Sequence, residues 1–387
     1  VKHVGKDGKP TDVYNTILFG YSGLGKDRGY QVPPVASGTT TMRLPKGTYL
    51  LDAWVTKDFT DPTGGLDWLV QPKLTVNKNT SVTIDARKTK AADIRVPDAQ
   101  AKPATAMIGY MYDPAGLGIG VGMDTFANLR MAHLGGEVSG LQQTWNGQWT
   151  KGAKAEYDVA TTAKVKKIQG NKVRHFKASE LATVKNQMGA SAPDKTGGLT
   201  ALGLFPEDFV FGSPIEQKLP GTRTVYLSTS DKIKWSLDFE QYGGHDADGW
   251  PIPEAYYTLG EPQTFKAGQS YSKKFNTAVF GPHLNADYGL FRDGNNIYGY
   301  LPLFADGAKH AGSSLFTSVK TSLYRNGTKV GTNDDPLFGD GVFKVPSGDA
   351  EYKLTTSVKR SAKVAAASTR IDASWTFRSK KPASGQV

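Results

Sequence analysis

The chain has 387 residues, which is long for one domain and sufficient for two or three. It contains no cysteine, which excludes disulfides, cysteine-ligated metal centres and a thiol nucleophile. The net charge of +11 either serves solubility or favours an anionic surface such as cell-wall polymer. The basic residues are scattered without a basic–aromatic motif, so we expect no nucleic-acid partner.

The composition predicts a mainly β protein. Gly 44, Pro 21 and an aromatic content of 11% favour strands separated by tight turns. We therefore expect tandem antiparallel β-sandwich domains, immunoglobulin-like or transthyretin-like, with at most one or two short helices. No run approaches the roughly 18 apolar residues of a membrane span, so none is expected. The pattern divides into a small β-sandwich module at 1–88, a central β-rich domain with insertions at 89–281 and a C-terminal sandwich at 282–387.

The first segment begins in a strand-like pattern at Val1, with no initiator Met and no signal stretch. We interpret this start as the sign that the chain is part of something longer. From Tyr49 to Val55, apolar residues alternate with others, as in a strand that is covered on at least one face.

The central segment has two clear strand patterns, at 222–228 and 234–239. One helix is predicted from Glu180 to Met188, with Ser179 as its N-cap and Gly189 as its stop signal. The run Gly116–Gly122 has glycine at alternate positions, which is not the spacing of a dinucleotide-binding loop. It favours a strand packed closely against another surface, or a flexible loop.

Two tryptophans flank an Asn-Gly pair in the central segment. If Asn146-Gly147 forms a two-residue hairpin turn, Trp145 and Trp149 lie on opposite faces of the ribbon. One of them would then be exposed near Lys151, where it could stack on a sugar or a peptide. These three residues, Trp145, Trp149 and Lys151, are the candidate ligand-binding set. The alternative, which we favour, is packing of the tryptophans against a neighbouring domain.

An acidic cluster is the candidate metal site. Asp246 and Asp248 have the D-x-D-G spacing that can present oxygens to calcium, and Glu254 lies close enough in sequence to contribute. The cluster lacks the other ligands of an EF-hand, and a polar turn is the competing interpretation. Calcium is therefore the only cofactor that we consider.

No catalytic residue is predicted. Ser22 lies in Gly20–Gly25, but Leu24 occupies the place of the second glycine of a G-x-S-x-G motif. The six histidines show no H-E-x-x-H spacing or other paired metal-ligand spacing.

The final segment has the clearest strand signals. Residues 319–323 alternate into Asn326-Gly327, which predicts a two-residue hairpin turn. Two further alternating runs follow, at 352–358 and 371–377. This pattern is typical of an immunoglobulin-like sandwich without its disulfide.

Several of these segments resemble one known family. They are Tyr300–His310, Leu323–Gly327, Ser374–Ser379, Lys6–Pro10 and Arg43–Tyr49. They are similar to the C-terminal, non-catalytic β-domains of large secreted subtilisin-like serine peptidases of actinobacteria, the Streptomyces type. In that family the Asp, His-Gly and Gly-Thr-Ser motifs lie upstream, and none of them occurs in this sequence.

The resemblance implies a non-catalytic accessory region of a secreted bacterial peptidase, which stabilises the enzyme or positions it on substrate or cell wall. Its partners would be the upstream peptidase domain, the substrate protein or a cell-wall polymer, and its location would be extracellular. Two alternatives stay open. One is an independent extracellular binding or adhesive protein for polysaccharide or anionic polymer, and the other is a protease-inhibiting pro-region.

Overall fold

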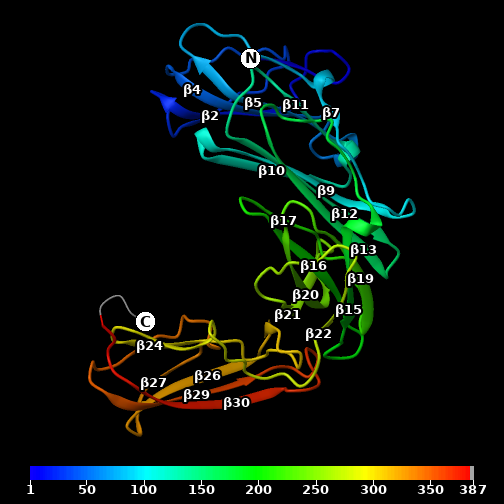
Figure 1. Ribbon diagram of the computed structural model, residues 1–387. Coiled ribbons are helices and arrows are strands. Elements are labelled where there is room, and N and C mark those ends of the chain that lie inside the picture. Colours follow the sequence, from blue (N-terminus) through cyan, green and yellow to red (C-terminus); the bar gives the residue numbers. More distant parts are fainter. Residues whose placement is uncertain (384–387) are drawn as a thin grey trace.

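The computed structural model describes residues 1–383, which fold as β-strands joined by turns (Figure 1). Within this range there is no α-helix, and the short 3-10 helices are η1 (Pro62–Gly64), η2 (Ala86–Lys88), η3 (Asp113–Ala115), η4 (Phe126–Asn128) and η5 (Ala178–Glu180). The predicted mainly β, multi-sheet fold class is confirmed. None of the helices in residues 1–383 has the length and apolar character needed to cross a membrane.

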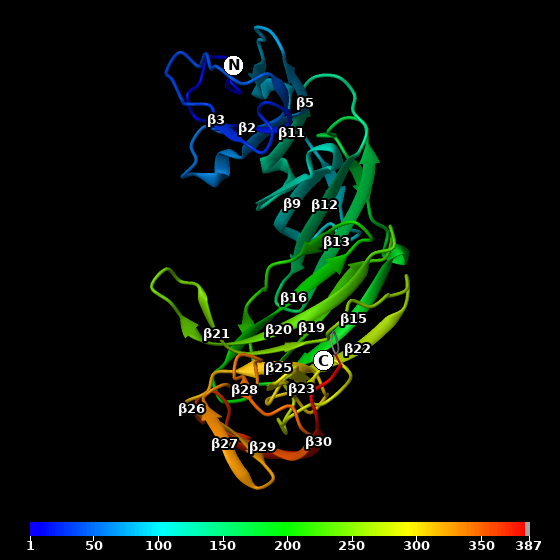
Figure 2. The ribbon, with the colours of Figure 1, turned by 90° about the vertical axis from the view of Figure 1, so that its left-hand side faces the viewer.

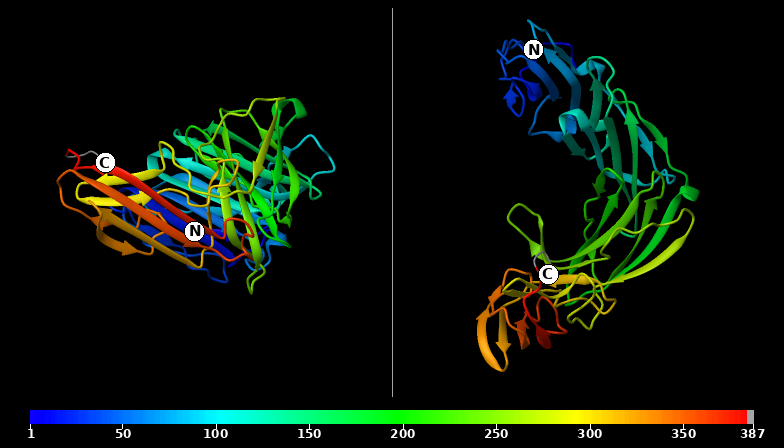
Figure 3. Two further views of the ribbon diagram at one scale, coloured as in Figure 1. Left: turned by 90° about the horizontal axis from the view of Figure 1, so that it is seen from below. Right: turned by 60° about the vertical axis from the view of Figure 1, so that its left-hand side comes forward.

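The sheets follow one another along a curved arc (Figures 1 and 2). The N-terminal strands lie at one end of the arc and the C-terminal sandwich lies at the other, which the right-hand view of Figure 3 shows most clearly. Four hydrophobic cores fill the spaces around and between the sheets.

The N-terminal sheet has six strands and is buried on both faces. In spatial order its strands are β3 (Gly29–Gln31), β2 (Tyr14–Gly23), β4 (Gly47–Val55), β5 (Leu66–Val76), β11 (Leu129–His133) and β7 (Lys90–Ala91). A parallel pair, β1 (Lys2–Val4) and β6 (Thr83–Asp85), lies beside it. In β4, Tyr49, Leu51 and Ala53 enter one core while Leu50 enters another. Because β7 and β11 come from beyond residue 88, this sheet crosses the expected first boundary.

The central sheet has seven strands, which in spatial order are β10 (Leu117–Met123), β9 (Lys102–Tyr112), β12 (Leu141–Lys151), β13 (Ala155–Val165), β19 (Gly221–Ser228), β15 (Leu181–Met188) and β22 (Ser270–Phe275). One face packs on the N-terminal sheet, with Trp145 and Val159 in the shared core. The other face packs on the next sheet through Val184 and Val225. A second parallel pair, β8 (Asp93–Arg95) and β14 (Val173–His175), lies outside the sheet.

The predicted helix at 180–188 is wrong, because these residues form β15. This strand pairs with β19 on one side and with β22 on the other. Its burial alternates, and Ala182, Val184 and Met188 enter one core. Ser179, the expected N-cap, lies inside η5, whose N-cap is Lys177; the Glu180 carboxylate accepts a hydrogen bond from the Lys177 backbone N–H. Hydrogen bonding to two neighbouring strands outweighs the local helix propensity.

The next sheet is named here the β20 sheet after its longest strand. Its strands are β17 (Phe209–Phe211), β16 (Thr196–Leu204), β20 (Lys234–His245), β21 (Pro251–Thr258) and β25 (Ala311–Ser314), with β18 (Gln217–Lys218) paired to β16. The strands predicted at 222–228 and 234–239 are confirmed as β19 and the first half of β20. Because β25 comes from beyond residue 281, this sheet crosses the expected second boundary.

Two further sheets form the C-terminal sandwich. One contains β23 (Gly289–Asp293), β24 (Asn296–Tyr300) and β28 (Phe343–Lys344); the other contains β27 (Thr328–Asn333), β26 (Ser318–Arg325), β29 (Ala350–Lys359) and β30 (Arg370–Ser379). The predicted hairpin is confirmed, since β26 and β27 meet at Asn326-Gly327 and both residues have positive φ.

Asp52 ties the N-terminal sheet to the central sheet. Its carboxylate accepts hydrogen bonds from Trp68 Nε1 at 2.8 Å and from the Tyr110 hydroxyl at 2.7 Å. Trp68 lies in the same sheet as Asp52, whereas Tyr110 comes from β9 of the central sheet. Burial raises the pKa of Asp52 to about 6, and the hydrogen bonds only partly oppose this shift.

This raised pKa predicts a pH-dependent effect of Asp52→Asn. The folded state binds the Asp52 proton more tightly than the unfolded state, so this contribution to stability is present below about pH 4 and is lost as the pH rises through 6. Relative to the wild type, the variant should therefore gain unfolding free energy between pH 4 and 7. Urea denaturation across this range measures the difference. Asp340→Asn, at an exposed position, is the control, and parallel profiles for wild type and Asp52→Asn would contradict the assignment.

A charged cluster is buried at the opposite face of the central sheet. Arg223 and Glu156 are both fully buried and form an ion pair with a separation of 2.6 Å. Arg223 Nε also donates to Gln217 Oε1 at 2.8 Å. Asp158 lies two residues after Glu156, and burial together with the negative charge of Glu156 raises its pKa well above the usual value.

Removing Arg223 should be strongly destabilising. Arg223→Met leaves the Glu156 carboxylate buried without its cation, and the expected loss of unfolding free energy is about 3–5 kcal/mol. The double variant Glu156→Met/Arg223→Met removes both charges and should lose less. Chemical denaturation followed by tryptophan fluorescence compares the two. A double variant that is less stable than Arg223→Met would refute this account.

Candidate functional site

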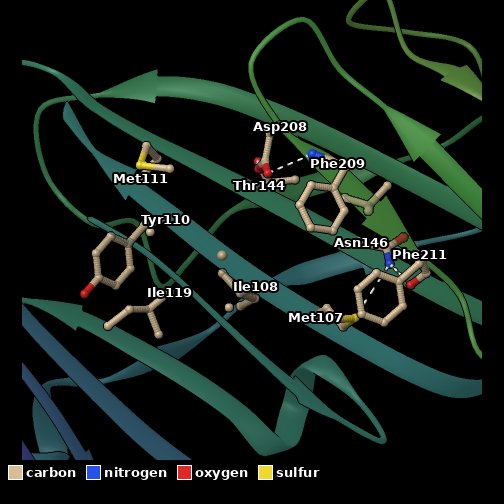
Figure 4. Close-up of a pocket in the computed structure, with 14 residues that line it drawn as sticks. Met107, Ile108, Tyr110, Met111, Ile119, Thr144, Asn146, Asp208, Phe209 and Phe211 are labelled. Atoms are coloured by element: carbon tan, nitrogen blue, oxygen red, sulfur yellow. Dashed lines mark hydrogen bonds between the residues drawn. The ribbon is translucent and has the colours of Figure 1, made fainter. Parts of the chain in front are cut away.

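The most distinctive surface feature is a groove at the edge of the central sheet, between β10 and β17 (Figure 4). The cavity has a volume of about 260 Å³, and we name it the glycine groove. Its lining residues come from β9, β10, β12 and the segment 208–211.

The floor of the glycine groove includes bare backbone at Gly120. The alternation in β10 directs Leu117, Ile119 and Val121 into the core shared with the N-terminal sheet. The glycines between them therefore face the groove, where Gly118 pairs with Met111 and Gly120 pairs with Gly109. A Cβ at Gly120 would meet no atom within 4 Å. Of the two alternatives for Gly116–Gly122, the strand is the one that forms, and its glycine face is open at Gly120, while Met111 lies close to Gly118 and Met107 lies close to Gly122.

Aromatic rings and methionines form the apolar sides. Phe209 and Phe211 are 67% and 43% exposed, and their rings are near-parallel with centroids 6.4 Å apart. Figure 4 shows these rings over the sheet, with Met107 near Phe211 and Met111 at the far end of the groove. Exposed aromatic and methionine side chains around a cavity are typical of a binding surface.

A ladder of polar side chains from β12 holds the 208–213 segment in place. The Thr144 hydroxyl donates to the Asp208 carboxylate, and Asn146 Nδ2 donates to the Phe211 carbonyl at 2.7 Å. Gln148 makes two bonds to Ser213, donating to its carbonyl at 2.9 Å and accepting from its N–H at 3.2 Å. The two bonds between Gln148 and Ser213 resemble the backbone hydrogen bonds between paired strands. The side chains of β12 thus fix the position of the segment that carries Phe209 and Phe211.

β10 is an edge strand of the central sheet, since in residues 1–383 it pairs with β9 alone. An edge strand presents a row of backbone donors and acceptors that can pair with another chain. The glycine groove therefore combines unpaired backbone groups with an apolar wall, which suits an extended polypeptide.

The hairpin considered for Trp145 and Trp149 does not form, and the favoured alternative, packing of the tryptophans, agrees with their place in the core between the N-terminal and central sheets. β12 runs through Asn146-Gly147 without turning, and both tryptophans lie on the same face. Trp145 is fully buried beneath Lys172, whose Nζ lies 5.0 Å from the ring centroid. Trp149 is 6% exposed, so neither ring is accessible for stacking. Residues 143–149 are all buried, and pairing with β9 and β13 on the two sides stabilises the continuous strand.

Lys151 forms an ion pair with Asp98, which lines a cavity beneath Trp149. Of the candidate ligand-binding set, Trp149 lines this cavity, Lys151 binds Asp98 at the same cavity, and Trp145 lies in the core. The tryptophan that is exposed beside a turn is Trp250, with 70% of its surface accessible.

The carboxylates of two of the three acidic candidates for calcium, Asp246 and Glu254, are held by other partners. Asp246 Oδ1 accepts from the backbone N–H groups of Asp248 and Trp250 in the turn between β20 and β21. Glu254 lies on β21 and forms an ion pair of 2.6 Å with Lys195. Within residues 1–383, no group of three or more His, Asp or Glu side chains is arranged to hold a metal ion.

One hydroxyl–imidazole contact is present. His3 Nε2 lies 2.9 Å from the Thr16 hydroxyl, and both residues are fully buried. Burial lowers the pKa of His3 to about 4, and the ring stacks on Tyr14. This pair is a packing feature of the N-terminal core.

The residues that sequence reasoning missed are Phe209 and Phe211. The available signal was the alternation in Phe209-Val210-Phe211, where Val210 is buried and both rings are exposed. Nothing in the sequence indicated that this strand would lie opposite the glycines of β10.

No protein-family model and no curated protein matches the chain. Among solved structures, the Bacillus anthracis TIE protein is similar at 10% identity and a TM-score of 0.16 over 95% of this chain, which spans 66% of that protein. BcpA, the major pilin subunit of Bacillus cereus, is similar at 11% identity and a TM-score of 0.16 over 71% of this chain and 97% of that one. Both scores are too low to support an argument about fold or function.

The polar ladder predicts a local effect of Gln148→Met. This change removes both hydrogen bonds to Ser213, so the 208–213 segment should exchange its amide hydrogens faster while 47–76 stays unchanged. Hydrogen–deuterium exchange read by mass spectrometry measures both segments. Gln142→Met, at a half-buried position of β12, is the matched control, and equal exchange at 208–213 in the two variants would rule out the ladder.

Proposed function

We propose that this chain is a non-catalytic accessory region of a secreted subtilisin-like serine peptidase, and that it holds polypeptide substrate in the glycine groove. The resemblance of segments such as Tyr300–His310 and Arg43–Tyr49 to the C-terminal domains of these enzymes supports the family assignment. The groove supports the role in substrate positioning.

The observation that carries the proposal is the chemistry of the groove. An extended substrate strand could pair with the backbone of β10, which is unpaired on its outer side within the described residues. A substrate side chain above Gly120 would meet no side chain from the floor, whereas one above Gly118 would contact Met111. The apolar side chains of the substrate would contact Phe209 and Phe211. Backbone pairing gives affinity without sequence selectivity, as a peptidase with many substrates requires.

The net charge of +11 supports a second part of the role. A cationic surface is attracted to anionic cell-wall polymers, and this attraction weakens as salt screens it. Such retention would keep the enzyme near the cell after secretion. The attraction to anionic polymer involves the whole surface. Raising the ionic strength weakens this attraction and so distinguishes it from peptide binding in the glycine groove.

Gly120→Val tests the groove directly. The valine side chain enters open space and suits a strand, so folding should be preserved while the floor is blocked. Affinity for labelled, reduced and carboxymethylated casein should fall at least about tenfold, or about 1.4 kcal/mol. Fluorescence anisotropy at high salt, where surface charge is screened, provides the measurement.

Gly29→Val is the matched control, because Gly29 lies on the edge strand β3 and a Cβ there also meets open space. Equal casein binding by both variants would contradict the groove assignment. Hydrolysis of casein by the purified chain, blocked by a serine-directed inhibitor, would contradict the non-catalytic role.

A further inference from the structure

A second cavity lies where the β20 sheet meets the C-terminal sandwich. Its apolar half has a volume of about 180 Å³ and its polar half about 360 Å³. Thr258, Tyr288, Tyr300 and Ala311 line both halves, so the two form one continuous cleft. We name it the tyrosine cleft. Clefts at such junctions are common ligand sites.

Aromatic side chains dominate the apolar half. Tyr288 and Tyr300 are tilted by 42° with ring centroids 5.8 Å apart, and Phe338 also lines the cleft. Tyr300 is 48% exposed and Phe338 is 51% exposed. Tyr300 and Phe338 are therefore accessible in the cleft, whereas Tyr288 also packs against the core of the C-terminal sandwich.

Polar side chains of both charges line the other half. Glu261, Asp287 and Lys309 are exposed there, and His283 lies beside them. Together they offer carboxylate acceptors, ammonium donors and an imidazole within one cavity. A ligand that fits both halves must have an apolar face and an edge rich in hydroxyl groups.

Three loops around the cleft are fixed by side chains that bind backbone N–H groups. Asn285 Oδ1 accepts from Asp287 and Tyr288 at 2.8 Å, which positions the Tyr288 loop. The buried Asp335 carboxylate accepts from Phe338 at 2.8 Å and from Gly341 at 2.9 Å.

The third loop carries Lys309. Asp306 Oδ1 accepts from the backbone N–H groups of Ala308 and His310, each at 3.0 Å, and Asp306 is itself buried. The aromatic and charged groups are therefore presented by loops with fixed backbones, so little conformational entropy is lost when a ligand binds.

We propose that the tyrosine cleft binds a saccharide. A pyranose ring has an apolar C–H face that can stack on Tyr300, Tyr288 and Phe338, and hydroxyl groups that can bond to Glu261, Asp287, Lys309 and His283. The site uses none of the residues of the glycine groove, so it does not depend on the proposed peptide binding.

The probes are chitohexaose, cellohexaose and maltohexaose, each titrated by isothermal titration calorimetry at up to millimolar concentration. At least one should bind, and both Tyr300→Ala and Phe338→Ala should raise its Kd about tenfold or more. Both side chains are half exposed, so both variants should fold, which circular dichroism checks. Tyr298→Ala, on the same strand but outside the cleft, should keep wild-type affinity.

Gly120→Val should also keep saccharide affinity, which separates this proposal from the peptide groove. Absence of binding by all three oligosaccharides overturns the proposal, as does binding that Tyr300→Ala and Phe338→Ala leave unchanged. Loss of casein binding in Tyr300→Ala without any saccharide binding would identify the cleft as a peptide site and would equally overturn it.

Discussion

The structure depends on the burial of the central sheet on both faces. This sheet forms one layer of two successive sandwiches, so each of its inner strands must present a suitable side chain to two cores. β12 meets this constraint by strict alternation. Trp145 and Trp149 fill the core towards the N-terminal sheet, while Asn146 and Gln148 bind the backbone of the β20 sheet. If the central sheet were covered on one face only, either the N-terminal sheet or the β20 sheet would lose its packing partner, and the arc in Figure 1 would be interrupted there.

Buried polar groups connect the layers on each side of the central sheet. Asp52 reaches across one interface to Tyr110, and Arg223, which pairs with Glu156 within the central sheet, donates across the other interface to Gln217 of β18. Such groups are costly to bury, and hydrophobic residues of similar volume often give equal stability. Their directional bonds fix how one sheet lies on the next. The glycine groove and the tyrosine cleft keep their shapes only if the sheets pack on one another in a single relative position.

Both proposed sites lie where the layers stop covering each other. The glycine groove forms at the free edge of β10, and the tyrosine cleft forms where β25 joins the β20 sheet from the far side of residue 281. In both places, side-chain oxygens bind backbone N–H groups and hold irregular segments, as Gln148 does for Ser213 and Asp335 does for Phe338. Exposed aromatic rings on fixed backbones are suited to binding because they lose little entropy.

The sequence by itself determined the β class and the strands whose alternation ends in a local turn. The hairpin at Asn326-Gly327 was predictable because positive φ at both turn residues is a local requirement that Asn and Gly satisfy. The strand at Gly116–Gly122 was predictable from its period of two. Neither prediction needed information about distant residues.

Only the tertiary structure decided the path of Asn146-Gly147 and the state of 180–188. Local signals favoured a turn at the first and a helix at the second, but hydrogen bonds from neighbouring strands on both sides made each a straight strand. The same reason applies to the candidate sites. Phe209 meets the glycines of β10, and Tyr288 meets Phe338, only because sheets formed from distant segments bring them together.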